Sequence, residues 1–318
     1  TIVDFKDIKF SKAGSSTTNM EIEHPILSSV CRKMLHAKDN INQIISETFL
    51  EILKELERTW IEILENISKY IGKIDVLQSK AYVARKYNYC SPEIEEKSEE
   101  NNKTHSFVSA YDLRHCLIEH LQQNEIYVTN NISLGCDGEQ GILLYGTNAV
   151  GKTSLIRALG ISIIMAQSGM YVPCSRFLYR PYTAIFSRIL GNDNIFKGLS
   201  TFAVEISELR VLLKLSDENS LVLGDELCSG TETESALSIF VAGLIQLSTK
   251  NTSFIFATHF HEIVNYEEIK NLKNVVMKHM AVSYDRENDC LIYDRLLRDG
   301  SGPRTYGLEV CKSLYLDE

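Results

Sequence analysis

The sequence predicts an α/β protein with a mostly parallel central sheet flanked by helices and preceded by a long helical segment. Three observations predict this fold. A glycine loop joins an apolar run, Ile142–Leu144, to a helical pattern. Two further apolar runs, Leu221–Gly224 and Phe254–Ala257, have the composition of buried strands, and residues 233–247 between them have helical periodicity. Strand–helix–strand alternation is typical of a parallel sheet covered by helices.

The long helical segment begins near Asp39, where apolar residues recur at steps of three and four as far as Ile74. A helix of about 30 residues would extend roughly 45 Å at 1.5 Å per residue. Two interpretations remain open on this pattern: a connector between domains, or a bundle helix broken near Gly72. Upstream, Phe5, Ile8 and Phe10 indicate a strand. We therefore expect a helical segment over residues 1–74 and an α/β domain over residues 75–318.

Composition limits the class of protein. The 318 residues carry a net charge of −9, which argues against a nucleic-acid surface formed by this piece alone. No apolar run has the length of a membrane span, so no membrane partner is expected. The eight scattered cysteines favour reduced thiols in an intracellular compartment over zinc or disulfides. The first residue is Thr1, so the sequence is expected to be a fragment of a longer protein.

Between the helical segment and the glycine loop the pattern is weaker. Asp75–Tyr87 has another apolar helical face, and Pro92 is expected to stop it. The charged stretch Glu93–Lys103 is predicted to be a solvated loop. Leu113–Glu119 and Ile126–Ile132 are predicted to be strands or strand edges.

After the glycine loop and its helix, three segments complete the prediction. Tyr182–Ile189 is expected to be extended, and Gly191–Asn194 is expected to be a turn. Thr201–Leu215 has a helical apolar period.

The glycine loop fits the phosphate-binding pattern G-x-x-x-x-G-K-[ST] between Gly146 and Thr153. Its two glycines allow the backbone to wrap with N–H groups pointing inward, and the helix N-terminus adds its positive dipole end. Lys152 can reach the β- and γ-phosphates, and the Thr153 hydroxyl can hold Mg²⁺. The loop therefore predicts a nucleoside triphosphate site.

Two further sites follow the predicted strands. Asp225 and Glu226 end one strand at the carboxyl edge of the sheet, where ligands bind in such folds. Asp225 is expected to hold Mg²⁺ opposite Thr153, and Glu226 to orient or deprotonate the attacking water. His259, at the end of the next strand, is the candidate for sensing the γ-phosphate. A metal site on His259 and His261 is disfavoured because alternate residues point to opposite faces.

Several of these segments together resemble the ATPase domain of the MutS DNA mismatch-repair family. The main ones are Gly146–Ser154, Ser200–Glu205, Leu221–Glu226 and Ala257–Glu262. Supporting segments are Asp75–Leu77, Leu113–His115, Asn124–Val128, Gly169–Pro173, Ile185–Arg188 and Tyr306–Leu308. The resemblance extends from about residue 75 to the end of the chain.

The resemblance implies an ABC-type P-loop ATPase in which two subunits enclose two nucleotides. Tyr127 would stack on adenine, Ser200 would begin the segment that reaches the γ-phosphate of the other subunit, and Thr231 would touch the partner. The residues assigned to ATP are Gly146, Thr147, Asn148, Ala149, Val150, Gly151, Lys152, Thr153, Ser154, Tyr127 and Ser200. Those assigned to Mg²⁺ are Thr153 and Asp225, and those assigned to catalysis are Glu226, His259 and Lys152.

The implied partners are a second copy of the ATPase subunit and DNA, the latter mainly through domains outside this chain. The helical segment would then be a lever that connects the ATPase to a DNA clamp. Thr147 and Val150 stand where the family has proline and glycine, so nucleotide affinity is expected to differ. The variant Gly224–Thr231 is similar to the branch found in giant viruses and octocoral mitochondria.

Two rival functions are weighed against a mismatch-repair ATPase. One is another ABC-type machine, of chromosome maintenance or transport, but those carry a Leu-Ser-Gly-Gly segment that this chain lacks. The other is a dimerisation module that binds nucleotide only for structure. Lys152, Asp225 and Glu226 together favour an enzyme.

Overall fold

The computed structural model describes residues 8–12, 20–95, 105–121, 126–136, 138–188, 201–225, 233–285 and 290–302. The chain divides into two compact units, Thr1–Leu77 and Gln78–Glu318. Among the described residues, no helix is both long enough and apolar enough to cross a membrane.

The first unit contains a short hairpin and most of helix α1. Strands β1 (Lys9–Lys12) and β2 (Met20–Glu23) pair antiparallel. α1 (Pro25–Tyr87) begins with proline, whose missing N–H costs nothing in the first turn. The preceding residue, His24, accepts the N–H of Ile26 on its Nδ1 at 3.2 Å and so caps the helix.

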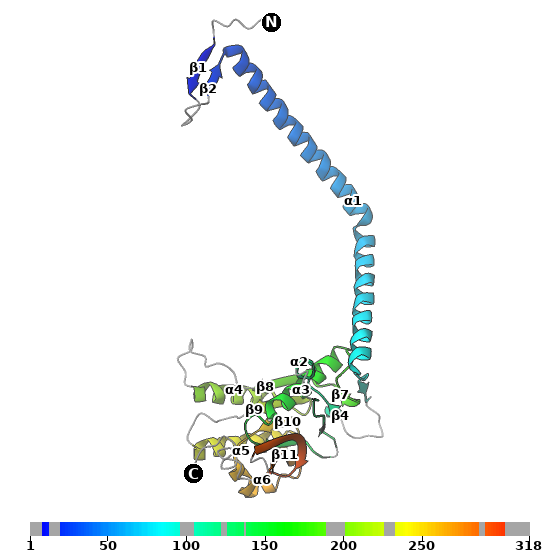
Figure 1. Cartoon of the computed structure of the whole chain (residues 1–318), viewed down its shortest axis with the longest axis vertical. Coiled ribbons are helices and arrows are strands. Elements are labelled where there is room, and N and C mark those ends of the chain that lie inside the picture. The colour runs from blue at the N-terminus through cyan, green and yellow to red at the C-terminus, as the bar shows by residue number, and fades with distance from the viewer. Residues whose placement is uncertain are drawn as a thin grey trace. The chain divides into compact units, whose positions relative to one another are not determined.

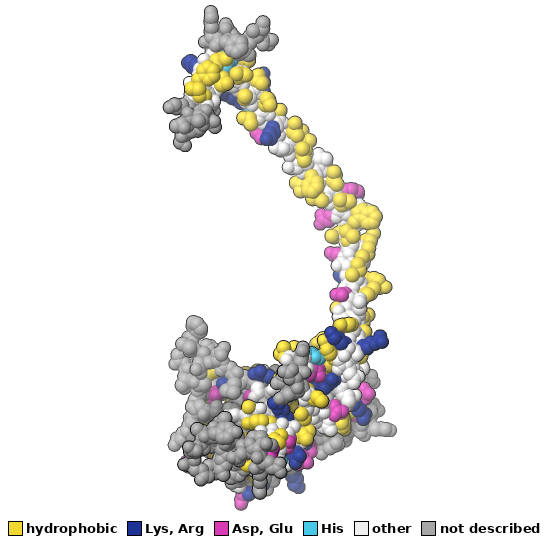
Figure 2. Space-filling view, in the orientation of Figure 1, with side chains coloured by type: hydrophobic (Ala, Val, Ile, Leu, Met, Phe, Trp, Pro, Cys, Tyr) yellow, Lys and Arg dark blue, Asp and Glu magenta, His cyan; other side chains and the backbone are white. Residues whose placement is uncertain are grey.

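α1 is longer than the sequence predicts. It has 63 residues, continues through Gly72 and reaches Tyr87 without interruption. The interpretation of a helix broken near Gly72 is therefore wrong. None of these 63 residues, all of which the structure describes, is buried. Figure 2 shows the apolar side chains along α1 in yellow.

The second unit has an α/β fold, as predicted, with two sheets and helices between and around their strands (Figure 1). The six-stranded sheet has the order β12-β11-β6-β10-β9-β8. Its strands pair in parallel from β11 to β8, and only β12 runs antiparallel to its neighbour β11. The strands are β6 (Gly141–Tyr145), β8 (Ala184–Arg188), β9 (Ser220–Asp225), β10 (Ser253–Ala257), β11 (Val275–Asp285) and β12 (Cys290–Asp299).

The second sheet has four strands in the order β3-β7-β4-β5. These strands are β3 (Glu93–Ile94), β4 (Phe107–Leu113), β5 (Asn130–Leu134) and β7 (Arg176–Arg180). The helices of this unit are α2 (Ile118–Leu121), α3 (Lys152–Gln167), α4 (Thr201–Leu215), α5 (Thr233–Thr249), the 3₁₀ helix η3 (His261–Asn265) and α6 (Glu267–Lys270).

Alternate side chains of β6 enter two different cores. Ile142 and Leu144 pack with α3 and with the four-stranded sheet, whereas Leu143 and Tyr145 pack with α4 and α5. A strand buried on both faces is what a continuous apolar run indicates. Both faces of the six-stranded sheet are therefore covered. A site can form only at the ends of its strands, in the loops that follow them.

Several local predictions are wrong. Only Leu113 of the predicted strand Leu113–Glu119 lies in a strand, because the chain then turns into α2. Of Ile126–Ile132, the first four residues have no regular structure and the rest begin β5. Glu93 and Ile94 pair with β7 rather than forming a loop. The predicted turn Gly191–Asn194 lies outside the described residues.

Candidate nucleotide site

The carboxyl ends of three parallel strands bring the predicted site residues together. Ala257, at the end of β10, pairs with Leu144 of β6 on one side and with Asp225 of β9 on the other. The phosphate loop after β6, the carboxylate ending β9 and the Thr258–His259 segment after β10 therefore meet at one edge of the sheet. This is the edge at which ligands bind in open α/β sheets.

The loop between β6 and α3 depends on its glycines. Gly151 has φ +107, which side-chain-bearing residues rarely adopt, and it directly precedes α3. A Cβ on Gly146 would lie 2.9 Å from Cγ1 of Val150. Val150 is fully buried in the core beside α3. Val150 thus fits at a position where the family has glycine, because its side chain packs into the core and anchors the loop.

The N-terminus of α3 is suited to an anion. Gly151 offers no side-chain cap, and none of the residues in the first turn, all of them described, is acidic. The first N–H groups of a helix have no intrahelical partner and carry the positive end of the dipole. The hydroxyl oxygen of Thr147 is also buried, without a hydrogen-bond partner among the described residues. Both features provide donors for phosphate oxygens.

Lys152 lies at the centre of the loop. Its side chain is 5% exposed, and its ammonium donates to the carbonyl oxygens of Gly146 at 2.7 Å and Thr147 at 3.0 Å. Nζ is also 3.4 Å from Nε2 of His259. A positive charge is therefore concentrated where the loop would hold phosphates.

Thr153 and Asp225 form the second half of the site. The Thr153 hydroxyl donates to Oδ2 of Asp225 at 2.5 Å. Asp225 is 3% exposed, and its Oδ1 has no hydrogen-bond partner in the part of the chain that the structure describes. An unsatisfied oxygen on a buried carboxylate is costly without a cation or donor. A hydroxyl beside such a carboxylate is a suitable donor set for Mg²⁺, which takes few protein ligands and completes its shell with phosphates and water.

The two histidines after β10 have different surroundings. His259 is exposed and reaches Lys152, whereas the His261 ring stacks on Tyr145 with centroids 5.1 Å apart. The hydroxyl of Thr258 accepts the N–H of Phe260 at 3.1 Å and so shapes the turn between them. No group of three or more His, Cys, Asp or Glu side chains arranged for a metal ion occurs in the described ranges.

A small cavity adjoins the phosphate loop. Its volume is about 140 Å³, and its lining includes Tyr127, Ala149 and Gly151. Burial raises the pKa of the Tyr127 phenol, and a hydrogen bond with the backbone of His115 acts in the opposite direction. Tyr127 is therefore close to the loop, as a residue that contacts the base of a nucleotide must be.

The cavity also contains residues that the sequence does not single out. Met280 and Arg295 line it from β11 and β12. Asn130 fixes β12 beside it, donating to the Arg295 carbonyl at 3.0 Å and accepting the N–H of Leu297 at 2.6 Å. These residues lie in strands that the sequence pattern does not predict, so only the pairing of β11 and β12 brings them here.

Three predicted site residues, Ser200, Glu226 and Thr231, lie outside the described residues. The helix that follows Ser200 is described from Val204 onward at the level of side chains. On α4, Glu205 accepts from the Arg188 guanidinium of β8 at 3.4 Å, and Glu208 pairs with it at 3.0 Å. This ion-pair group joins α4 to the edge of the six-stranded sheet.

Comparisons with known proteins identify the family of the chain. A family model described as MutS domain V matches residues 142–318. The chain is 36% identical over 345 residues to a putative DNA mismatch repair protein mutS homolog of Acanthamoeba polyphaga mimivirus, covering 97% of this chain and 30% of that protein. It is 36% identical over 297 residues to a mitochondrial DNA mismatch repair protein mutS homolog of Sarcophyton glaucum, covering 93% and 29%. It is 34% identical over 289 residues to DNA mismatch repair protein MutS of Staphylococcus aureus, covering 90% and 31%. The chain thus spans less than a third of the length of these relatives.

Proposed function

Since this chain belongs to the MutS family of DNA mismatch-repair proteins, we propose that residues 75–318 form an ABC-type ATPase domain that binds and hydrolyses ATP with Mg²⁺. The predicted resemblance to the family, with its viral and octocoral mitochondrial members, is confirmed. The observation that carries the proposal is the pairing of Thr153 with Asp225 beside Lys152.

The phosphates of ATP would bind to the loop Gly146–Ser154. Backbone N–H groups of the loop and of the first turn of α3 would face the phosphate oxygens. Lys152 would exchange its bonds with loop carbonyls for bonds with the β- and γ-phosphates. Thr153 and Asp225 would hold Mg²⁺, which neutralises charge on the phosphate oxygens when bound. The base would enter the cavity beside Tyr127 and stack on its ring.

Hydrolysis requires a positioned water in line with the γ-phosphate. Glu226, the residue after the buried Asp225, would orient this water or accept its proton. His259 follows the neighbouring strand and would contact the γ-phosphate from the other side of Lys152. The 3.4 Å distance from its Nε2 to Lys152 Nζ supports this role, because it brings both side chains to the same part of the phosphate loop.

The complete site would need a second subunit. Ser200 would approach the γ-phosphate bound by the partner copy, and Thr231 would contact that copy near its catalytic acid. ATP binding would then favour pairing, and hydrolysis would release it. In the whole protein this cycle would switch a DNA clamp through residues 1–74, with α1 as the lever. Lesion recognition would lie in the parts of the protein that this chain does not include.

Phosphate release by the purified chain tests the enzyme assignment. Wild type should hydrolyse ATP, and Glu226→Gln should bind ATP but turn over about a hundredfold more slowly, because it cannot act as a base. The assignment is refuted if neither form consumes ATP. A protein-concentration series tests the composite site, since activity per chain should rise as subunits pair. Constant activity per chain, in a sample that is monomeric at its lowest concentration, would contradict the role of Ser200.

A further inference from the structure

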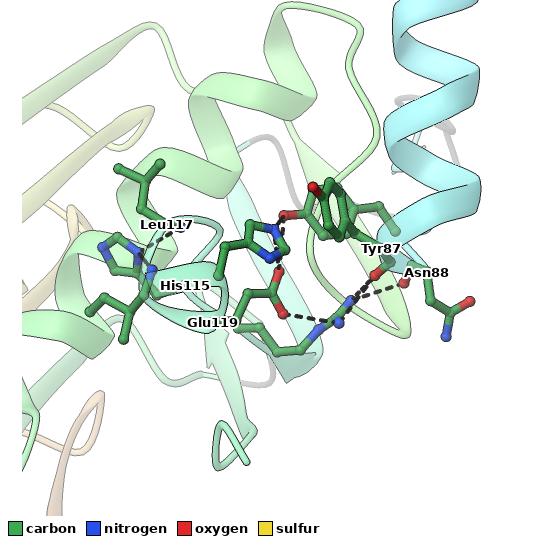
Figure 3. Close-up of polar contacts among 9 residues, drawn as sticks. Tyr87, Asn88, His115, Leu117 and Glu119 are labelled. Carbon is green, nitrogen blue, oxygen red and sulfur yellow. Dashed lines mark hydrogen bonds and ion pairs between the residues drawn. The ribbon is translucent and has the colours of Figure 1, made fainter. Parts of the chain in front are cut away.

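The C-terminal end of α1 is capped by a side chain from a distant segment. Asn88 adopts a positive φ of 53°, and the N–H of Tyr89 bonds to the Ala84 carbonyl at 3.0 Å, which closes the last turn. The Arg114 guanidinium then donates to the carbonyl of Tyr87 at 3.2 Å and to that of Asn88 at 2.9 Å (Figure 3). The last carbonyls of a helix lack intrahelical partners, so Arg114 supplies bonds that the helix cannot make itself.

Glu119 holds Arg114 in this position. One carboxylate oxygen pairs with the guanidinium at 3.1 Å, and the other accepts the Tyr89 hydroxyl at 2.9 Å. The Glu119 side chain is only 9% exposed. The ring of the next residue, His120, lies on that of Tyr87 with centroids 3.9 Å apart. Figure 3 shows the dashed contacts that lead from Glu119 through the guanidinium to Tyr87 and Asn88 at the end of α1. Both oxygens of the carboxylate are thus used to join residues 114–120 to the end of α1.

The segment that contains Arg114 and Glu119 also forms one wall of the nucleotide cavity. Ile118 lines the cavity together with Tyr127. Nδ1 of the buried His115 accepts the N–H groups of Leu117 at 3.3 Å and Ile118 at 3.4 Å, which sets the turn before α2. The backbone of His115 is also close enough to Tyr127 to act on the pKa of its phenol, which it lowers while burial raises it. Residues 114–120 therefore contribute to the wall of the base cavity through Ile118 and contact the end of α1 through Arg114 and Glu119.

We propose that Arg114 and Glu119 are positioning residues that couple occupation of the base cavity to the C-terminal end of α1. This inference rests on the proposed function, since it takes the base of ATP as the ligand of the cavity. A base packed against Ile118 and Tyr127 stabilises the arrangement in which Arg114 caps α1. By linkage, loss of that arrangement weakens binding of the base by the same factor.

The coupling acts on the base and not on the phosphates, which provides a specific test. Glu119→Gln keeps the shape of the side chain, but it removes the negative charge and replaces one of the two accepting oxygens by an NH2 group, which cannot accept from Arg114 or Tyr89. The dissociation constants of a non-hydrolysable ATP analogue and of inorganic tripolyphosphate are measured on the full chain. We expect Glu119→Gln to weaken the analogue about tenfold and to leave tripolyphosphate unchanged. The matched control is Glu95→Gln, which breaks the 3.1 Å ion pair with Arg180 in the four-stranded sheet and should alter neither constant.

Hydrogen exchange tests the other end of the coupling. In wild type, the analogue should slow amide exchange over residues 80–89, whereas tripolyphosphate should not, and Glu119→Gln should abolish the effect. Tyr89→Phe removes the contacts of the hydroxyl with Glu119 and His120 but leaves the pair of Glu119 with Arg114. It should give a smaller change of the same kind, so it serves if Glu119→Gln does not fold. The proposal would be overturned if Glu119→Gln weakened the binding of both ligands equally or left the affinity for the analogue unchanged. It would also be overturned if the analogue did not alter amide exchange over residues 80–89 in wild type. If wild type binds neither ligand, the proposed ATPase function itself fails.

Discussion

Helix α3 follows the phosphate loop, whereas helix α1 precedes the sheets of the second unit, and the two differ most in burial. Nine of the 16 residues of α3 are buried, and its Gly160 lies so close to β9 that a Cβ would meet Leu223 at 2.6 Å. None of the 63 residues of α1 is buried, and Trp60 and Tyr70 are 50% and 66% exposed. Core packing therefore holds α3, whereas α1 has no buried residue along its length and its last carbonyls bond to Arg114.

The difference follows from what each helix has to do in the proposed function. α3 must hold backbone N–H groups and Lys152 within hydrogen-bond distance of phosphates, and a dense core resists displacement. In the proposed function α1 would act as a lever outside any core, and its own helical hydrogen bonds would then make it rigid. The contacts of Arg114 supply its attachment. Equivalent substitutions in the two helices and their surroundings should therefore have unequal effects.

The largest difference is expected between two lysines. Lys152→Met removes the buried ammonium of the phosphate loop, and we expect ATP turnover to fall by about a hundredfold or more, as when a charge-stabilising donor is lost. Lys69→Met on α1 removes an ammonium whose side chain is 69% exposed and which pairs with Glu65 at 3.6 Å. Its turnover should equal that of wild type. Turnover is measured by phosphate release, and similar values in the two variants would show that Lys152 is not part of the site.

The second prediction concerns the buried core behind the site, which α1 lacks. Gly224 on β9 lies against the ring of Phe256, and a Cβ there would be 2.1 Å from Cδ1 of that ring. The ring is 1% exposed and cannot move into solvent. We expect Gly224→Ala to lower the free energy of unfolding by about 1–3 kcal/mol, the usual cost of overpacking. Urea denaturation of the chain measures it, and an unchanged midpoint would show that the sheet adapts more easily than its packing indicates.

The parts predicted correctly from the sequence are those whose signal is local. The phosphate loop, β9 and β10 have motifs or apolar runs that need no partner to be recognised. Helix α4 begins and ends where its apolar period predicts, at Thr201 and Leu215. Such elements are buried on one face or on both, so their hydrophobic pattern is strong.

The parts that the sequence does not predict depend on pairing between distant segments. The hairpin of β11 and β12 carries Met280 and Arg295 into the nucleotide cavity, but its residues are mostly half-buried and give no clear alternation. The contacts of Arg114 with the end of α1 cannot be predicted from the sequence either, because a charged residue in a turn has the pattern of an ordinary surface residue. Only the fold reveals which carbonyls it meets.

A smaller effect, dependent on pH, is expected at His115. Burial lowers its pKa, and Arg157 acts in the same direction while Glu119 opposes it. The unfolded chain takes up a proton near pH 6.5, whereas the folded chain resists protonation. The contribution of His115 to stability is therefore constant above about pH 7 and is lost as the pH falls through 6.5 toward the lower folded pKa. Protonation would also convert Nδ1 from an acceptor into a donor.

His115→Asn separates this contribution from those of the other histidines. An asparagine oxygen accepts N–H groups two and three residues ahead in the same kind of turn, but it does not titrate. The difference in urea midpoint between pH 8 and pH 5.5 should be smaller in the variant than in wild type. An identical difference in both would mean that His115 does not take up a proton on unfolding in this range.

The smallest expected effect has the opposite sign and lies in α1. Gly72 is a helix-interior glycine, and a Cβ added to it would have no described atom of another segment within 4 Å, so Gly72→Ala meets no neighbour. Alanine favours a helix over glycine by about 1 kcal/mol. We expect slower amide exchange around residue 72 and an unchanged urea midpoint for the second unit, because α1 contributes no buried residue to a core. Loss of stability on this substitution would mean that α1 packs against a partner at Gly72, and the contrast with α3 would then hold only for the isolated chain.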